Sequence, residues 1–515
     1  MSFIEVTVAR KSEHPETQIT VYDAPCGYGK STAVMNYINK SSPHQKFLVL
    51  AAYESEMNRY EEKCTKLVQP QDKHPNGGKL ESFRELLDED KSIVTSHVLA
   101  ERLTDDDWQK LHAKEYALFI DEEPTCITPY SPETDEDLFN RIKKEFPTLT
   151  DKERKKILAM MNRMSTDDIE LFVQSYCVED PETKLLSLKA IKDGEEREPV
   201  SKIYSHLIDL VKAHKLVHGG KGELLKIFPP TFLKAMSQIH ILTYGFEDST
   251  FDCYLKSYGY GYYKGYIAYG RKTDENGFTY ADKESRELTY DKEEAIYIPT
   301  DYKDLITIWD NEHINESLPK EMQEKMKKMG KLNAPGCGYF SLSSTAYKEH
   351  MTKDEIRQML KNMHNWCRNY AHLNPSQMFF VTYNRTVADD SDRNFWTTDS
   401  LKVKYKNRHV PCNIRATNDY ANCSGVAYLI NRFMHGSVCN YFNSIGCPPN
   451  KDKFSTNELV QTVFRSGIRN GQHIDVYIPS SRMRDLLRAW IDEQDRLNKE
   501  YYKSQKEMLE SVPFS

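Results

Sequence analysis

Short runs of apolar and β-branched residues recur along the chain, and each ends in polar or glycine residues. They are 18–23 (QITVYD), 46–53 (KFLVLAAY), 92–97 (SIVTSH), 116–120 (YALFI) and, much later, 239–246 (IHILTYGF). Runs of this length and composition are typical of β-strands. The unbroken apolar stretch in YALFI is typical of a strand buried on both faces of a parallel sheet. The pattern therefore predicts an α/β fold built on parallel strands.

A glycine-rich turn follows the first of these strands. Residues 23–32 read DAPCGYGKST, and residues 31–40 have the pattern of a helix. A strand, a glycine-rich turn and a helix form the context of a P-loop, whose backbone N–H groups bind phosphates. The predicted nucleotide-binding residues are Ala24, Gly27, Tyr28, Gly29, Lys30, Ser31 and Thr32. In this reading Lys30 reaches the β- and γ-phosphates of ATP, and Ser31 coordinates Mg²⁺. Ala24 stands where the strict pattern has glycine, and the alternative is an accidental Gly-Lys-Ser loop.

Three carboxylates end the apolar run of the fourth strand. Asp121, Glu122 and Glu123 fall at its carboxyl end, which is where parallel sheets bind ligands. We expect Asp121 to hold Mg²⁺, and Glu122 to orient and deprotonate the attacking water. Acidic strand ends are common, so the box alone is a weak signal. Paired with the P-loop, it predicts an ATP site.

The loop at 24–31, the box at 121–124 and the Leu-Thr-Tyr strand end at 242–244 together resemble motifs one, two and three of superfamily two (DEAD/DEAH-box-like) helicases. Motif three of that family is Ser/Thr-Ala-Thr, so the match at Thr243 is partial. LAAYESEMNRYEE and TSH resemble the motifs that follow the second and third strands. RATNDY, AYLINRFM and FRSGIRNG resemble, more closely, proteins described as helicases in tailed phages of Gram-positive hosts.

The stretch ELVQTVFRSGIRNG (458–471) resembles motif six of the same family, Gln-x-x-Gly-Arg-x-x-Arg. Gln461 and Arg465 keep the family's spacing. Phe464 replaces the glycine, and Arg469 comes one residue late. The resemblance implies that these polar residues act on the nucleotide.

Local pattern gives this stretch a predicted helix. Ser455 with Glu458 matches a capping box, so the helix is expected to begin near 456. On that helix Gln461, Arg465 and Arg469 recur every four residues and share one face. Such a face suits an arginine finger. The alternative is a solvated basic face.

The resemblance implies two RecA-like P-loop domains with parallel sheets, plus a helical insertion and a tyrosine-rich connecting region. The predicted order is a first RecA-like domain at 1–255 with an insertion at about 125–235, a connecting region at 256–350, a second RecA-like domain at 351–492 and a helical tail at 493–515. Capping-box patterns at Thr150 and Ser165 make the insertion helical. Residues 481–511 read as one amphipathic helix.

The tyrosine-rich stretch 257–270 (SYGYGYYKGYIAYG) alternates, and an Asn-Gly pair follows it, which predicts a hairpin. Its tyrosines could stack on bases, as aromatic side chains do in proteins that bind single strands. The alternative is ordinary packing of strand aromatics on a helix.

A basic run lies in the predicted second domain. Residues 401–420 hold Lys402, Lys404, Lys406 and Arg408 with no acid before Asp419. This run is predicted to contact a nucleic-acid backbone. The alternative is a charged edge strand that avoids aggregation.

Composition narrows the picture. The 515 residues carry a net charge of −7, with 70 basic and 77 acidic side chains, which excludes a histone-like positive coat but leaves room for a basic groove. No apolar run is long enough to span a bilayer, and the N-terminus lacks the layout of a signal peptide. The eleven cysteines form no CxxC pair, which favours free thiols. We expect a cytoplasmic protein without a membrane partner, in the host cytoplasm if it is phage-encoded.

The predicted function is an ATP-dependent helicase or translocase of phage-type replication or recombination. It would use ATP and Mg²⁺, bind DNA in preference to RNA, and meet other replication proteins. The alternative is an ATPase motor without strand separation, such as a DNA-packaging terminase. The clustered carboxylates of a packaging nuclease are not evident after residue 351. A small-molecule kinase ranks last, because kinases rarely need a second RecA-like half.

Overall fold

The computed structural model describes residues 7–72, 78–131, 136–161, 165–190, 202–220, 222–273, 279–310, 342–383, 404–405, 407–412 and 419–511. The chain forms two compact units. The first comprises residues 1–296 and 434–450, and the second comprises residues 297–433 and 451–515. Each unit contains its own sheet with parallel strands.

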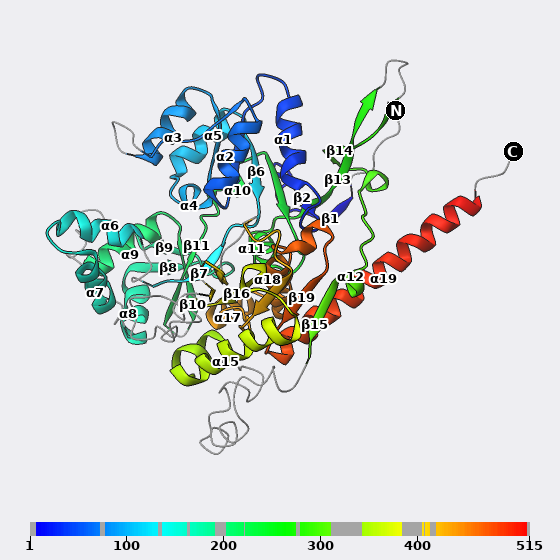
Figure 1. The fold of residues 1–515 in the computed structure, drawn as a ribbon. Helices are drawn as coiled ribbons and strands as arrows, with labels where there is room; N and C mark the ends of the chain where they lie inside the picture. Colours follow the sequence, from blue (N-terminus) through cyan, green and yellow to red (C-terminus); the bar gives the residue numbers. More distant parts are fainter. Residues whose placement is uncertain are drawn as a thin grey trace. The chain divides into compact units, whose positions relative to one another are not determined.

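The first unit is built on a nine-stranded sheet with the order β1-β13-β2-β12-β6-β3-β5-β4, and β14 pairs with β13 (Figure 1). The strands are β1 (Val8–Arg10), β2 (Gln18–Asp23), β3 (Phe47–Ala51), β4 (Leu67–Val68), β5 (Ser92–Ser96), β6 (Ala117–Asp121), β12 (Gln238–Thr243), β13 (Tyr262–Thr273) and β14 (Thr279–Thr289). From β13 to β4 every neighbouring pair is parallel. The five strands predicted from apolar runs are all present. β3 and β6 are buried along their whole length, as unbroken apolar runs require.

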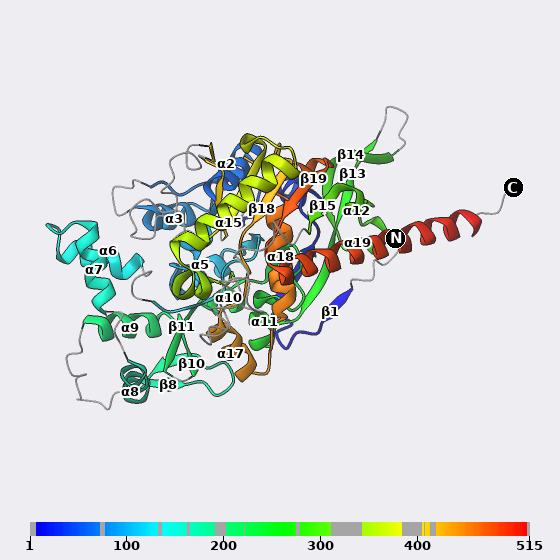
Figure 2. The same cartoon turned by 60° about the horizontal axis from the view of Figure 1, so that its bottom comes forward.

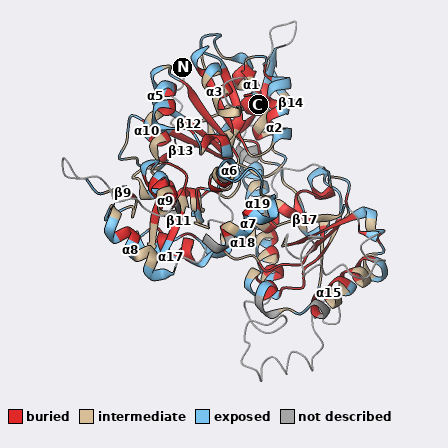
Figure 3. Ribbon diagram, turned by 90° about the vertical axis from the view of Figure 1, so that its left-hand side faces the viewer, coloured by how far each residue is buried: buried red, intermediate tan, exposed pale blue. Residues whose placement is uncertain are grey.

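Helices connect the parallel strands of this sheet. They are α1 (Lys30–Lys40), α2 (Glu54–Lys63), α3 (Lys79–Asp88), α4 (His97–Ala100), α5 (Asp105–Ala113), α10 (Thr231–Ala235) and α11 (Thr250–Ser257). Figure 3 shows the strands mainly in the colour of buried residues, while many helices carry an exposed face. This is the expected result of amphipathic helices covering a parallel sheet.

The insertion between β6 and β12 is partly helical and partly β. Its elements are β7 (Ile127–Pro129), α6 (Glu136–Glu145), α7 (Asp151–Met161), α8 (Thr166–Tyr176), β8 (Cys177–Glu179), β9 (Leu186–Leu188), α9 (Lys202–Lys212), β10 (Leu216–Gly220) and β11 (Glu223–Ile227). The capping boxes predicted at Thr150 and Ser165 are both formed. The two small sheets, β10-β11-β7 and β8-β9, were not predicted.

A distant segment packs on this insertion. Helix α17 (Gly436–Ser444) belongs to the first unit, although the chain on either side of residues 434–450 belongs to the second. Figure 2 shows α17 next to β10 and β11, and the Tyr441 phenol donates a hydrogen bond to the Thr183 carbonyl at 2.8 Å. The sequence did not predict that residues 434–450 belong to the first unit.

The tyrosine-rich stretch forms the predicted hairpin, β13 with β14. It also does something unpredicted, because the first part of β13 pairs in parallel with β2 and extends the main sheet. Gly265 permits this, since a Cβ there would lie 2.4 Å from the Tyr22 ring. Tyr260 and Tyr262 are buried, which fits ordinary packing better than a base-stacking surface. The first unit therefore extends to residue 296, beyond the predicted boundary at 255.

The second unit has a five-stranded, all-parallel sheet with the order β15-β19-β18-β16-β17. Its elements are α12 (Tyr302–Leu305), β15 (Ile306–Trp309), α15 (Lys353–Asn365), β16 (Met378–Thr382), β17 (His409–Pro411), β18 (Gly425–Tyr428), α18 (Lys451–Val463), β19 (Ile474–Tyr477) and α19 (Ser481–Ser511). A capping box of Thr352 with Glu355 starts α15. The helix predicted at 481–511 is α19, with the same bounds. Among the described helices, none is long and apolar enough to cross a membrane.

A buried histidine in the first sheet makes stability depend on pH. His240 lies on β12, stacked on Phe119 with ring centroids 4.4 Å apart, and burial lowers its pKa to about 4. The folded state thus favours the neutral ring. This contribution is fully present above the unfolded-state pKa of about 6.5 and is lost as the pH falls toward 4.

We therefore expect the parent protein to lose about 3 kcal/mol more unfolding free energy between pH 7 and pH 4 than His240→Phe does. Urea unfolding of both proteins at several pH values, followed by tryptophan fluorescence, measures this difference. Parallel pH curves would show that His240 does not carry the effect.

Candidate active site

The predicted P-loop joins β2 to α1. Gly27 and Gly29 have φ angles of +88° and +82°, in the left-handed region that favours glycine. Gly29 occupies the N-cap of α1 and has no side chain to cap the first helical N–H groups. These donors and the positive end of the helix dipole are what a phosphate group needs.

Lys30 completes the loop. Its ammonium donates to the carbonyl of Ala24 at 2.7 Å and to that of Pro25 at 3.4 Å, and the residue is 7% exposed. The loop therefore curls around its own lysine, which keeps a compact cation at the N-terminus of α1. The donors present fit a nucleotide phosphate.

The acidic box ends β6 with an unusual backbone. Glu122 has a φ of +65°, which is rare for a residue with a side chain, and its N–H donates to the Leu242 carbonyl at 2.9 Å. Glu123 has a different partner, because its carboxylate accepts a hydrogen bond from the Thr243 hydroxyl at 2.9 Å. The two glutamates thus have different environments, and the strand end that resembles motif three contacts Glu123.

The sheet order brings these pieces to one edge. β12 lies between β2 and β6, and its Leu242 and Thr243 are in register with Asp121 and Asp23 respectively. All three strands are parallel, so their carboxyl ends meet. From β2 the chain continues through α1 to β3, on one side of the β2–β12 pair. From β12 it continues through α11 to β13, on the other side of that pair. This reversal of strand order is where open α/β sheets bind ligands.

A buried tyrosine links the acidic strand to the P-loop. The Tyr60 phenol, on α2, donates to Asp121 Oδ2 at 2.8 Å, and the Ser31 side chain lies beside this phenol. Burial raises the pKa of Tyr60 well above its usual value, and the charge of Asp121 raises it further, so the phenol keeps its proton. Sequence reasoning missed Tyr60, whose position in α2 matches an ordinary core residue.

Two arginines that were not predicted contact the P-loop from outside. Arg59, next to Tyr60, donates to the Thr32 hydroxyl at 3.1 Å. Arg286, on β14, donates to the Tyr28 carbonyl at 3.3 Å, and a Cβ at Gly29 would lie 2.7 Å from its side chain. The hairpin of β13 and β14 therefore braces the loop, in addition to extending the sheet.

The predicted arginine helix is different in the structure. Helix α18 begins at Lys451 and ends at Val463, before both arginines. Arg465 is buried at 6% exposure, and Arg469 is exposed in a short 3₁₀ turn, Gly467–Asn470. Gln461 alone of the three lies on α18, so the prediction that they share one helix face is wrong.

Hydrogen bonding explains this difference. The Ser455 hydroxyl donates to the Lys451 carbonyl one turn earlier in α18 and to the Arg432 carbonyl outside the helix, so Ser455 lies inside the helix rather than at its cap. After Val463 the chain turns, and Gly467 N–H donates to the Cys423 carbonyl at 2.8 Å. The catalytic roles of Gln461, Arg465 and Arg469 remain predictions.

The basic run is only partly described, because Lys402 and Lys406 lie outside the described residues. Lys404 is exposed. Arg408 is half-buried, and its guanidinium contacts Cys423 Sγ at 3.8 Å. The run leads into β17 at the edge of its sheet, which favours the charged-edge alternative. Contact with a nucleic-acid backbone stays a prediction.

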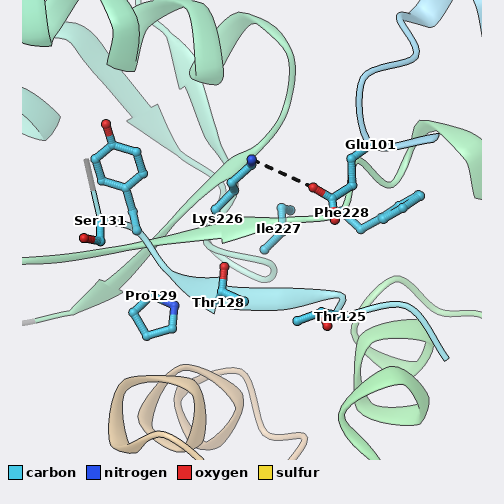
Figure 4. Close-up of a pocket in the computed structure, with 9 residues that line it drawn as sticks. Glu101, Thr125, Thr128, Pro129, Ser131, Lys226, Ile227 and Phe228 are labelled. Carbon is cyan, nitrogen blue, oxygen red and sulfur yellow. Dashed lines mark ion pairs between the residues drawn. The ribbon is translucent and has the colours of Figure 1, made fainter. Parts of the chain in front are cut away.

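Two hollows lie in the first unit. One, of about 130 Å³, is lined by residues of β7 and β11 and by Thr125, which follows the acidic box in the chain. In it the Lys226 ammonium lies 3.8 Å from the Glu101 carboxylate (Figure 4). It would hold only a few water molecules. The other, of about 760 Å³, is lined by residues such as Glu13, Pro230 and Gly259, which precede the starts of β2, β12 and β13. It thus lies at the opposite edge of the sheet from the P-loop.

The fold is mixed α/β with parallel sheets, and comparisons with known proteins agree for the C-terminal part. Residues 300–491 match the model of the YonV C-terminal Rossmann-like domain. Over 489 residues the chain is 25% identical to the SPbeta prophage-derived uncharacterized protein YonV of Bacillus subtilis (strain 168). The aligned region covers 93% of this chain and 99% of that relative. The similarity therefore spans both units.

Proposed function

We propose that this protein is an ATP-driven nucleic-acid helicase or translocase that binds ATP at the edge where β2, β12 and β6 end. The observation that carries the proposal is the hydrogen bond from the Tyr60 phenol to Asp121, with the Ser31 side chain beside the same phenol. Asp121 and Ser31 are the two side chains that the P-loop and the acidic box assign to Mg²⁺. Their shared contact with one phenol makes them near enough to serve one ion.

Each residue of the edge has a role in this proposal. Lys30 and the first N–H groups of α1 bind the β- and γ-phosphates. Ser31 and Asp121 would hold Mg²⁺, which neutralises phosphate charge when bound. Glu122 accepts the proton of the attacking water. Glu123 holds Thr243 and does not take part in proton transfer.

The nucleic-acid part of the proposal rests on resemblance. We infer that the second unit, with five parallel strands, is a second RecA-like domain, and that the substrate is DNA rather than RNA. We further infer a role in phage-type replication or recombination, in the host cytoplasm and alongside other replication proteins. The similarity to a prophage-derived protein, YonV, fits a phage context for this proposal.

A strand-displacement assay tests the motor. A fluorescent DNA duplex with a single-stranded overhang is incubated with the protein and Mg²⁺, with ATP or with a non-hydrolysable analogue. The proposal expects strand release only with ATP. ATP hydrolysis that DNA stimulates without release of the strand would favour a motor of the DNA-packaging type.

A further expected result concerns Arg465. If it acts as a finger, Arg465→Lys should lower turnover by about a thousandfold while nucleotide binding stays within a few-fold, because lysine lacks the planar, forked guanidinium. Phosphate release and binding of a fluorescent ATP analogue measure the two quantities. Lysine is chosen because Arg465 is buried and alanine would leave a cavity. Parent-like turnover in Arg465→Lys would remove this residue from catalysis.

A further inference from the structure

Tyr60 is placed where a metal site needs support. It is fully buried and packs among Met57, Val94 and other residues of the core beneath α1 and α2, which fixes its ring. Its phenol reaches out of this apolar core to Asp121 Oδ2 at 2.8 Å. A hydroxyl anchored by a rigid ring gives the carboxylate a hydrogen bond of fixed direction.

That hydrogen bond limits how the carboxylate can turn. One oxygen of Asp121 accepts from the phenol, so the other oxygen is oriented by the same contact. The Ser31 side chain lies beside the same phenol, so the hydrogen bond from Tyr60 holds the Asp121 carboxylate near the Ser31 hydroxyl. Hydrogen bonds of this kind to metal-binding carboxylates tune metal affinity by about 10–100-fold.

The helix that carries Tyr60 contacts the P-loop a second time. Arg59 donates to the Thr32 hydroxyl, so consecutive residues of α2 contact the two hydroxyl residues that follow Lys30. Helix α2 is therefore fixed against both the P-loop and the acidic strand. This arrangement makes the spacing around Asp121 a property of α2 as well as of the sheet.

We propose that Tyr60 is a positioning residue for the magnesium ion of the ATP site, holding Asp121 and Ser31 in the arrangement that binds the metal. The proposal rests on the proposed function, and it goes beyond it because the resemblance of residues 50–62 to a helicase motif gave Tyr60 no role at the metal. The phenol itself does not touch the nucleotide.

Metal binding can be measured without hydrolysis. Mn²⁺, which electron paramagnetic resonance detects, is titrated into the full chain with a non-hydrolysable ATP analogue. Tyr60→Phe keeps the ring and removes the hydroxyl, and it should weaken Mn²⁺ binding about tenfold or more. Nucleotide affinity measured in EDTA should stay within twofold of the parent. Excess Mg²⁺ should restore most of the hydrolysis rate.

Tyr116→Phe is the matched control. Tyr116 is also buried in the first unit, and its phenol donates to the Lys91 carbonyl at 2.6 Å, away from the acidic box. It should keep parent-like Mn²⁺ affinity. Equal Mn²⁺ affinity in Tyr60→Phe and the parent, or equal losses in both variants, would overturn the proposal. A parent chain that binds no metal–nucleotide complex would instead contradict the proposed function itself.

Discussion

Replacing Lys30 with alanine is expected to lower ATP hydrolysis by about a hundredfold or more. Lys30 is the cation of the loop, held against the carbonyls of Ala24 and Pro25 at the N-terminus of α1. Without it, the negative charge that develops on the phosphates in the transition state loses a fixed counter-charge in a site of low exposure. Phosphate release at saturating Mg²⁺ and ATP measures the effect.

Lys40→Ala is the control for this variant. Lys40 lies at the other end of α1, exposed, and pairs with Glu287 on β14. The substitution removes a lysine from the same helix and leaves the loop unchanged. We therefore expect turnover within about twofold of the parent, as for most surface changes. Parent-like turnover in Lys30→Ala would contradict the assignment of a P-loop.

Replacing Glu122 with glutamine is expected to leave ATP binding intact and to lower turnover by about 10²–10⁴-fold. The amide keeps the size of the side chain but cannot accept a proton from water. The left-handed backbone of Glu122 sets this side chain apart from its neighbours in the box. Binding of a fluorescent ATP analogue and single-turnover hydrolysis separate the two effects.

Glu123→Gln provides the comparison. The amide oxygen of glutamine can still accept the hydrogen bond of the Thr243 hydroxyl, so this variant should stay close to the parent. If Glu123→Gln is inactive and Glu122→Gln is active, the roles assigned within the box are reversed.

Sequence predicted those parts of the first unit that are determined locally. The unbroken apolar run in 117–120 requires burial on both faces, and β6 is buried throughout. A strand, two glycines with a lysine, and a helical pattern sit next to one another in the chain, so the loop of 24–32 needed no distant information. The α/β class with parallel sheets follows from the same short runs and is confirmed.

The parts of the fold and of the site that the sequence did not predict depend mostly on contacts between residues far apart in the chain. Tyr60 meets Asp121 across 61 positions, and Tyr263 pairs with Thr20, neither of which any local pattern encodes. The prediction that a helix carries Arg465 was wrong for a local reason. Ser455 matches a capping box by its spacing, yet the backbone continues as helix through it, and the turn at Ser466 and Gly467 ends the regular structure early.

The most direct test of the account is the rate of phosphate release by the parent protein with Mg²⁺ and ATP, measured alone and with single-stranded DNA, duplex DNA or RNA. The account predicts hydrolysis that Lys30→Ala lowers by about a hundredfold or more and that DNA stimulates more than RNA. Hydrolysis no faster than that of Lys30→Ala under all four conditions would contradict it.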